Sequence, residues 1–257
     1  MTEELKVRLV RLADIYESPS FLTDDPAQFM HRYGDIRDAE LVAFIAANLA
    51  FGRRTLILQH VELILAAAGD SLAEWIAGGG YERLFPQSGD SFYRVFSFRS
   101  MRLLCDGLRH ILCESPTLGD YFKKKYSDSG GRIPLVALIG QEFPPACTII
   151  CHGARSAAKR LHLFLRWMVR DNSPVDMGFW AGWYSKEQLL VPLDTHVLQQ
   201  SAELGLLRRT ASGRLPAPSL GTAVALSAEL AEAFPGDPAR GDFALFGLGV
   251  AGGGANP

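Results

Sequence analysis

The sequence of 257 residues predicts an all-α protein. Apolar residues recur at spacings of three and four through most of the chain, as over 41–49, and this spacing places them on one face of a helix. Sustained alternation of apolar and polar residues, which marks half-buried strands, is almost absent. Ser, Thr or Asp precede several apolar segments and Gly or Pro follow them, as at the two ends of helices.

These signals divide the chain into helices and connections. A helix over 3–16 rests on leucines at helical spacing, and one over 38–52 begins at an Asp and ends at a Gly. An aromatic-rich stretch over 81–98 and a Trp-containing segment over 171–190 are expected to be loops. Further helices are expected at a short segment ending near Gly34 and over 54–68, 71–76, 100–113, 117–126, 133–141, 156–170, 195–204, 220–233 and 242–250.

The composition is that of a soluble protein with a sizeable core, with 48% apolar and 21% charged residues. No apolar run reaches membrane-spanning length, and residues 1–6 lack the charge and hydropathy of a signal peptide. The four cysteines are too few and too irregularly spaced for a disulfide framework. We therefore expect a cytoplasmic protein with no membrane partner.

The net charge of -2 argues mildly against a nucleic-acid partner, because DNA-binding domains are usually basic as a whole. Local clustering can still build a basic face on a neutral protein. The basic clusters at 53–54, 123–125, 155–160 and 208–209 are either solvated surface or anion-binding surface, and the composition leaves both interpretations open.

The predicted helix over 156–170 carries an all-cationic face. Its basic residues follow one another at spacings of four, three, four and four, with no carboxylate on that face. Such a face suits the phosphates of a nucleic acid. These residues are Arg155, Lys159, His162, Arg166 and Arg170.

A second helix start lies in the segment 190–207. Pro192 ends the preceding structure, Asp194 can cap the helix that follows, and Gly205 suits its end. A carboxylate at a helix N-terminus is held where backbone N–H groups favour its ionised form. Asp194 is thus at least a helix cap.

The word Pro-Leu-Asp-Thr-His-Val at 192–197, followed by Leu-Gly-Leu at 204–206, resembles the sequence around the catalytic aspartate of helix-hairpin-helix DNA glycosylases. The segment 153–159 is similar to the Gly-x-x-small-x-x-Lys arrangement that carries the nucleophilic lysine of their bifunctional members. Asn48 stands where these proteins usually have Gln. Asp242 and Phe246 stand where the archaeal 8-oxoguanine branch has an aspartate and a base-stacking aromatic residue.

The resemblance implies a two-lobed helical fold with a central cleft, formed by one domain over 1–257 whose N-terminal segment packs with the C-terminal helices. It implies a monomeric, nucleoid-associated base-excision repair glycosylase with AP-lyase activity that binds double-stranded DNA and removes an oxidised purine, 8-oxoguanine first. The implied catalytic residues are Lys159 and Asp194. Base recognition would fall to Asn48, Asp242, Phe246, Trp180 and Trp183, and contacts to the DNA backbone to Gly153, Arg155, Arg160, His162, Arg166 and His196.

Several features depart from that family. Of the glycines in the usual hairpin, Gly153 alone remains, and the stretch between Lys159 and Asp194 is longer than in the endonuclease III branch. A C-terminal four-cysteine cluster is absent, so no iron–sulfur centre is expected. The pattern Cys147-x-x-x-Cys151-His152 lacks a further ligand pair nearby, so we expect neither a metal nor another cofactor.

The chemistry explains why these residue types would be needed. Cleavage of an N-glycosidic bond builds positive charge on the sugar, which a fixed carboxylate such as Asp194 would stabilise. A neutral Lys159 amine attacking C1′ would give a Schiff base that permits elimination of the 3′ phosphate. The base must leave the duplex and would be read by an aromatic face and an amide.

Other interpretations remain open. Lys159 can be a solvated helix lysine, Phe246 a core residue and Asn48 a satisfied buried amide. At the level of function, the chain can also be a non-catalytic nucleic-acid-binding protein on the same scaffold, or a glycosidase that acts on RNA or free nucleosides.

Overall fold

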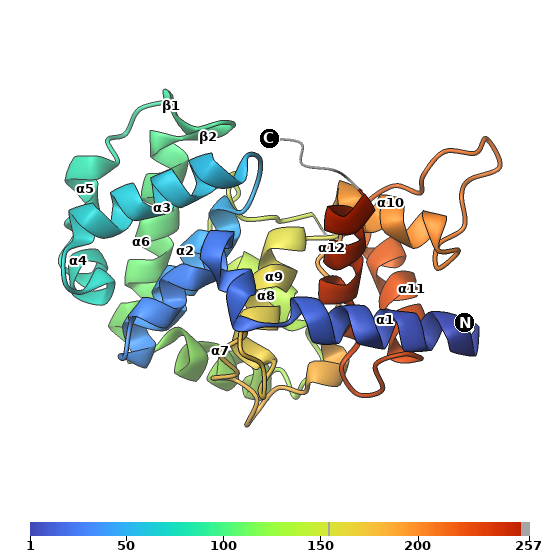
Figure 1. Ribbon diagram of the computed structural model, residues 1–257. Coiled ribbons are helices and arrows are strands. Elements are labelled where there is room, and N and C mark those ends of the chain that lie inside the picture. The colour runs from blue at the N-terminus through green and yellow to red at the C-terminus, as the bar shows by residue number, and fades with distance from the viewer. Residues whose placement is uncertain (154, 253–257) are drawn as a thin grey trace. The chain divides into compact units, whose positions relative to one another are not determined.

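A computed structural model describes residues 1–153 and 155–252, with side chains placed as far as Gly249 (Figure 1). The chain forms two compact units. Unit 1 combines Met1–Thr23 with Gly153–Pro257, and unit 2 is Asp24–His152. The described residues are predominantly helical and contain one two-stranded sheet, which confirms the predicted all-α class.

Unit 2 is built around α2 (Ile36–Leu49), which is buried on nearly every side. Two acidic residues of α2 are buried, and their carboxylates accept hydrogen bonds from backbone N–H groups at the N-termini of neighbouring helices. Asp38 accepts hydrogen bonds from the backbone N–H of Ala73 at 2.7 Å and from the hydroxyl of Ser71, and Glu40 accepts one from the N–H of Gly119 at 3.0 Å. Each carboxylate thereby satisfies N–H groups that a helix start leaves without intrahelical partners.

The remaining elements of unit 2 surround this helix. They are η2 (Pro26–Arg32), α3 (Arg54–Ala68), α4 (Leu72–Ala77), α5 (Tyr81–Leu84), β1 (Ser91–Tyr93), β2 (Phe96–Ser97), α6 (Phe98–Glu114), α7 (Leu118–Asp128) and α8 (Leu135–Gln141). The stretch 81–98 was expected to be a loop and instead holds a short helix and an antiparallel hairpin. Its strands are too short to produce a visible alternation in the sequence.

Unit 1 joins the two ends of the chain. Its elements are α1 (Glu3–Tyr16), η1 (Pro19–Asp24, which runs into unit 2 at its last residue), α9 (Lys159–Val169), η3 (Lys186–Gln188), α10 (Thr195–Glu203), α11 (Leu220–Ala231), η4 (Pro238–Arg240) and α12 (Gly241–Gly252). Helix α1 packs on α12, and α12 also packs on α10. At the first contact a side chain on Gly247 would lie 2.1 Å from the ring of Tyr16, so glycine is required there.

The segment 171–190 closes the C-terminal end of α9. The N–H of Met177 donates to the carbonyl of Trp167 and that of Trp180 to the carbonyl of Met168, each at 2.7 Å. These contacts satisfy carbonyls that the helix end leaves open. They also bury Trp180, which is 1% exposed and packs edge-on against Phe164 with ring centroids 5.2 Å apart.

The later part of the predicted cationic face of α9 does not face solvent. Arg166 and Arg170 are each 2% exposed, and the fully buried Asp176 lies between them. Arg170 also contacts Glu17 at 2.8 Å and Asp237 at 2.9 Å. The expectation that Arg166 would contact DNA is therefore wrong, because carboxylates far away in the sequence already occupy this face.

His162 likewise lies inside. It is 5% exposed, and neither ring nitrogen has a hydrogen-bond partner among the described residues. Burial lowers its pKa to about 4, so the ring is neutral at neutral pH. A neutral, buried imidazole does not contribute to a DNA-backbone contact, and this expectation is also wrong.

No helix in the described part of the chain is both long and apolar enough to cross a membrane.

We predict that Arg170→Leu destabilises the fold by about 3–5 kcal/mol, because it leaves three carboxylates without the buried cation that they share. Urea unfolding followed by circular dichroism measures this change. Arg11→Leu, on the exposed side of α1, is the control and should shift the free energy of unfolding by about 0.5 kcal/mol or less. Equal stability of the two variants would contradict a structural role for the buried charges.

Candidate functional site

Lys159 and Asp194 meet in unit 1, although 35 positions separate them in the sequence. The ammonium Nζ of Lys159 lies 3.2 Å from Oδ2 of Asp194, and the two side chains are 33% and 32% exposed. Both groups are thus half-buried and open to a ligand from solvent. The pair expected from the sequence is brought together by the start of α9 and the start of α10.

Asp194 uses its two carboxylate oxygens differently. Oδ1 accepts a hydrogen bond from the N–H of Val197 at 2.8 Å, which caps α10, and Oδ2 faces Lys159. The helix-cap interpretation and the ion-pair interpretation therefore hold together. Capping fixes the rotation of the carboxylate and so fixes the direction of its second oxygen.

The backbone before Lys159 is unusual. Ala158 has φ 41° and ψ 41°, in the left-handed region that residues with a Cβ rarely adopt. The sequence predicted a helix start at residue 156. In the structure the helix begins at Lys159, because of this backbone conformation. No side chain caps it. An ammonium at the first position of a helix lies against the positive end of the helix dipole, so helix stability does not account for this lysine.

Asp242, at the first turn of α12, is the third member of the site. Burial and, to a smaller extent, the negative charge of Asp194 raise the pKa of its carboxyl to about 6. The positive charges of Arg166 and Lys159 act in the opposite direction. Asp242 therefore lies within electrostatic range of both members of the ion pair. Its side chain is 14% exposed and hydrogen-bonds to Nη1 of Arg166. A carboxyl that titrates near pH 6 can carry a proton at physiological pH.

Arg166 holds Asp242 in place. Its guanidinium bridges Asp242 and Asp176 and lies over the ring of Phe243, with Cζ 4.4 Å from the ring centroid. These contacts leave Asp242 few alternative orientations. Arg166 thus acts on the site through Asp242 rather than through DNA.

The aromatic residues expected to read a base are mostly packed inside unit 1. Phe246 contacts Phe21 edge-on with ring centroids 5.0 Å apart, and Tyr16 at 6.2 Å. Trp180 is buried, so its assignment to base recognition is wrong. The partly exposed Trp183 contacts Trp180 at 5.2 Å.

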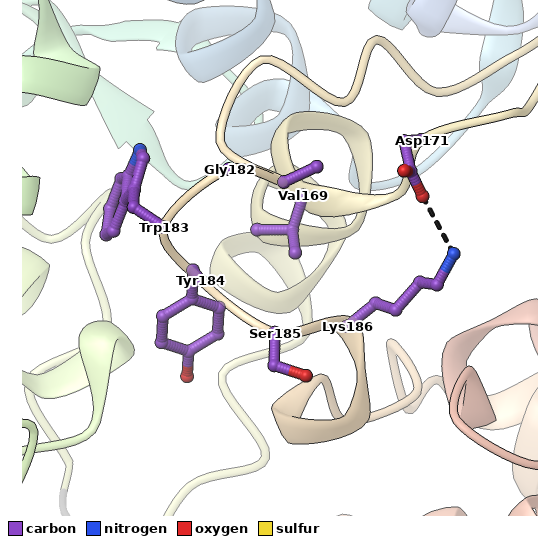
Figure 2. A pocket seen from close by; sticks show the side chains of 8 residues that line it. Val169, Asp171, Gly182, Trp183, Tyr184, Ser185 and Lys186 are labelled. Atoms are coloured by element: carbon purple, nitrogen blue, oxygen red, sulfur yellow. Dashed lines mark hydrogen bonds and ion pairs between the residues drawn. The ribbon is translucent and has the colours of Figure 1, made fainter.

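Trp183 lines a hollow of about 350 Å³, together with Tyr184, Ser185 and the Lys186–Asp171 ion pair of 2.7 Å. Figure 2 shows these side chains around the last residue of α9, Val169. Lys159 is the first residue of that helix, and ten residues of helical rise separate the two ends by about 15 Å. The hollow is therefore not part of the Lys159–Asp194 site.

The other predicted contacts are spread over both units. In unit 2, Asn48 is fully buried and donates from Nδ2 to the carbonyl of Phe44 at 2.9 Å. In unit 1, Gly153, Arg155 and His196 are exposed and Arg160 is partly exposed.

The described residues contain no group of three or more His, Cys, Asp or Glu side chains arranged to hold a metal ion. Cys147 is buried, and its Sγ donates to the carbonyl of Ser100 at 3.7 Å.

Unit 2 exposes a surface that the sequence did not reveal. Phe51 is 42% exposed and Val95, in the hairpin turn, is 73% exposed. The Arg94 guanidinium carbon lies 4.9 Å from the Phe51 ring centroid, and Arg94 itself has φ 52°. Arg53, two residues after Phe51 in the sequence, is also exposed. This part of unit 2 therefore exposes apolar and cationic side chains, and it holds Arg94 in the left-handed backbone region.

Comparison with known proteins identified a family match. A family model described as "Protein of unknown function (DUF2400)" matches residues 25–251. Searches of curated proteins and of solved structures found no match to the chain. Because the matched region covers most of both units, the chain belongs to this DUF2400 family.

Proposed function

We propose that the protein is a DNA glycosylase with associated AP-lyase activity that acts on an oxidised purine, with 8-oxoguanine as the first candidate. The observation that carries this proposal is the 3.2 Å contact between Lys159 and Asp194 at two helix starts. An amine and a fixed carboxylate are the two groups that Schiff-base glycosylase chemistry requires. The sequence resemblance around 153–159 and 192–206 supports the same assignment.

In the proposed reaction, the Lys159 ammonium first loses one proton to solvent, and its neutral amine then forms a bond to C1′ of the sugar while the bond from C1′ to the base breaks. The base leaves with the bonding electrons and takes up one proton. Ring opening then moves a proton from the lysine nitrogen to O4′ and leaves a protonated Schiff base. Loss of a C2′ proton expels the 3′ phosphate, which is the lyase step.

The three side chains divide these tasks. The Asp194 carboxylate stabilises the cationic sugar and holds the Lys159 amine against it. Asp242 supplies the proton that the leaving base requires, because its carboxyl, with a pKa of about 6, is partly protonated near neutrality. Lys159 is the nucleophile.

A non-catalytic nucleic-acid-binding protein is the second candidate. The exposed surface formed by Phe51, Val95, Arg94 and Arg53 favours it, since aromatic and guanidinium groups bind bases and phosphates without any chemistry. That surface fits a glycosylase equally well. Covalent chemistry at Lys159 therefore separates the two candidates.

The first prediction concerns that covalent step. Borohydride added to the protein with a duplex containing 8-oxoguanine should trap a covalent adduct, and Lys159→Gln should give none. Lys186→Gln is the matched control, because Lys186 also pairs with an aspartate, Asp171, in the same unit. This control should form the wild-type amount of adduct. Absence of an adduct with the wild type, across oxidised purines and abasic sites, would refute the lyase proposal.

Asp194→Asn tests the carboxylate. The amide oxygen of Asn can still accept from the N–H of Val197, so the helix cap and the stability should be retained. Single-turnover base release should fall by about 10²–10³-fold, because the cationic sugar loses its counter-charge. Duplex affinity should change little. Asp35→Asn is the control, since Asp35 also caps a helix through Oδ1 but lies in unit 2. An Asp194→Asn variant with wild-type turnover would rule out this role.

The pH dependence tests Asp242. If its protonated form is the acid, the ratio of the wild-type rate of base release to the Asp242→Asn rate should fall as the pH rises through about 6, because the protonated fraction of Asp242 falls about tenfold per pH unit above the pKa. Every other pH-dependent step is shared by the two proteins and cancels in the ratio. Asp242→Asn should be slower than the wild type. Asp171→Asn, an aspartate outside the site, should keep the wild-type profile. A ratio that stays constant between about pH 5 and 8 would contradict the assignment.

A further inference from the structure

The segment 208–214, here called the arginine loop, leads from the end of α10 toward α11. Every residue in it is exposed. Figure 1 shows the chain between these two helices extending away from them. Three of its seven residues are arginines: Arg208, Arg209 and Arg214. The proposed reaction uses none of them.

Internal hydrogen bonds give the arginine loop a defined shape. The N–H of Thr210 donates to the carbonyl of Arg214 at 2.9 Å, and the N–H of Arg214 returns to the hydroxyl of Thr210 at 3.1 Å. Gly213 turns the chain with φ 75°, and its carbonyl accepts from Nη1 of Arg209 at 3.2 Å. The loop therefore presents its charges from a narrow, closed turn.

The described residues supply no counter-charge to this loop. No Asp or Glu occurs between Glu203 and Glu229. None of the three guanidiniums forms an ion pair in the described part of the chain, in contrast to Arg166, Arg170 and Arg240, which all do. Like charges on one short loop repel one another, and a bound anion would relieve this repulsion.

We propose that the arginine loop binds the phosphodiester backbone of nucleic acid. Guanidiniums match phosphate oxygens with paired, directional donors, and several on one turn match the repeated charge of a strand. The loop offers no large apolar side chain that could enter a lipid bilayer, since Ala211 is the one aliphatic residue within it. The chemistry therefore favours a nucleic acid over a membrane surface.

The arginine loop lies within reach of DNA held at the candidate site. Helix α10 has nine residues and spans about 14 Å, with Asp194 at its start. The four steps from Leu204 to Arg208 add at most about 14 Å. A duplex rises about 3.4 Å per base pair, so the backbone of Arg208 lies within about eight base pairs' length of Asp194. Six residues beyond the loop, the first residue of α11 is fixed to Arg155, whose carbonyl accepts from the N–H of Leu220 at 2.9 Å.

The test is the salt dependence of duplex binding, measured by fluorescence anisotropy with an undamaged labelled 20-base-pair duplex. The variant is Arg208→Gln/Arg214→Gln, which keeps Arg209 and its bond to Gly213. The charge-matched control is Arg8→Gln/Arg11→Gln, which removes two exposed arginines of α1 in the same unit.

We expect the slope of log affinity against log salt to decrease in magnitude by about 1.8, or 0.9 for each lost phosphate contact. The control should keep the wild-type slope. Equal slopes for variant and control, or no duplex binding by the wild type, would overturn the proposal. So would binding to anionic phosphatidylserine vesicles that the variant loses while its duplex binding stays unchanged.

The proposal takes its DNA partner from the proposed function, but the two can fail separately. The anisotropy assay needs no chemistry and can be repeated in the Lys159→Gln background. A reduced slope together with absent borohydride trapping would keep the arginine loop and reject the lyase. Normal trapping together with an unchanged slope would do the reverse.

Discussion

The packing of unit 1 depends on the ion pairs that the Arg166 guanidinium forms with two carboxylates. It is buried between Asp176, from the segment after α9, and Asp242, from the start of α12. Without Arg166, Asp176 would keep Arg170 as a partner, but Asp242 would lose the cation that it hydrogen-bonds to, and buried charges without such partners are costly. One cation on α9 therefore joins two elements. The first is the segment 171–190, which closes the end of α9, and the second is α12, which packs against α1.

This arrangement connects the stability of unit 1 to its candidate chemistry. Asp242 is both a partner in the buried network and a neighbour of Lys159 and Asp194. Burial raises the pKa of its carboxyl, and Arg166 limits that rise. The same cation therefore stabilises the packing of α12 and sets how strongly Asp242 holds its proton. Selection for stability alone would favour a lower pKa here, since a lower pKa accompanies a better-compensated carboxylate.

Local signals in the sequence were enough to predict the helical class, the cap at Asp194 and the end of α10 at Gly205, which has φ 73°. These features depend on residues within one turn of each other. The fate of Arg166 could not be predicted in this way, because its partners lie 10 and 76 positions away. His162 was misassigned for the same reason: periodicity identifies a face of a helix, but the packing of distant segments decides whether that face meets water. Trp180 was assigned by resemblance, and it is buried because the segment 171–190 folds back onto the end of α9.

The candidate site was predicted from resemblance rather than from residue spacing. The structure adds the backbone geometry around Lys159, which residue spacing does not show. Lys159 lies at the positive end of a helix, after a left-handed alanine, and both features oppose stability. Asp194 offsets part of this cost through Oδ2, the carboxylate oxygen that does not cap α10. A lysine elsewhere on the surface would need no such compensation. The chemistry that we propose would account for an ion pair that joins an unfavourably placed lysine to an aspartate that also caps a helix.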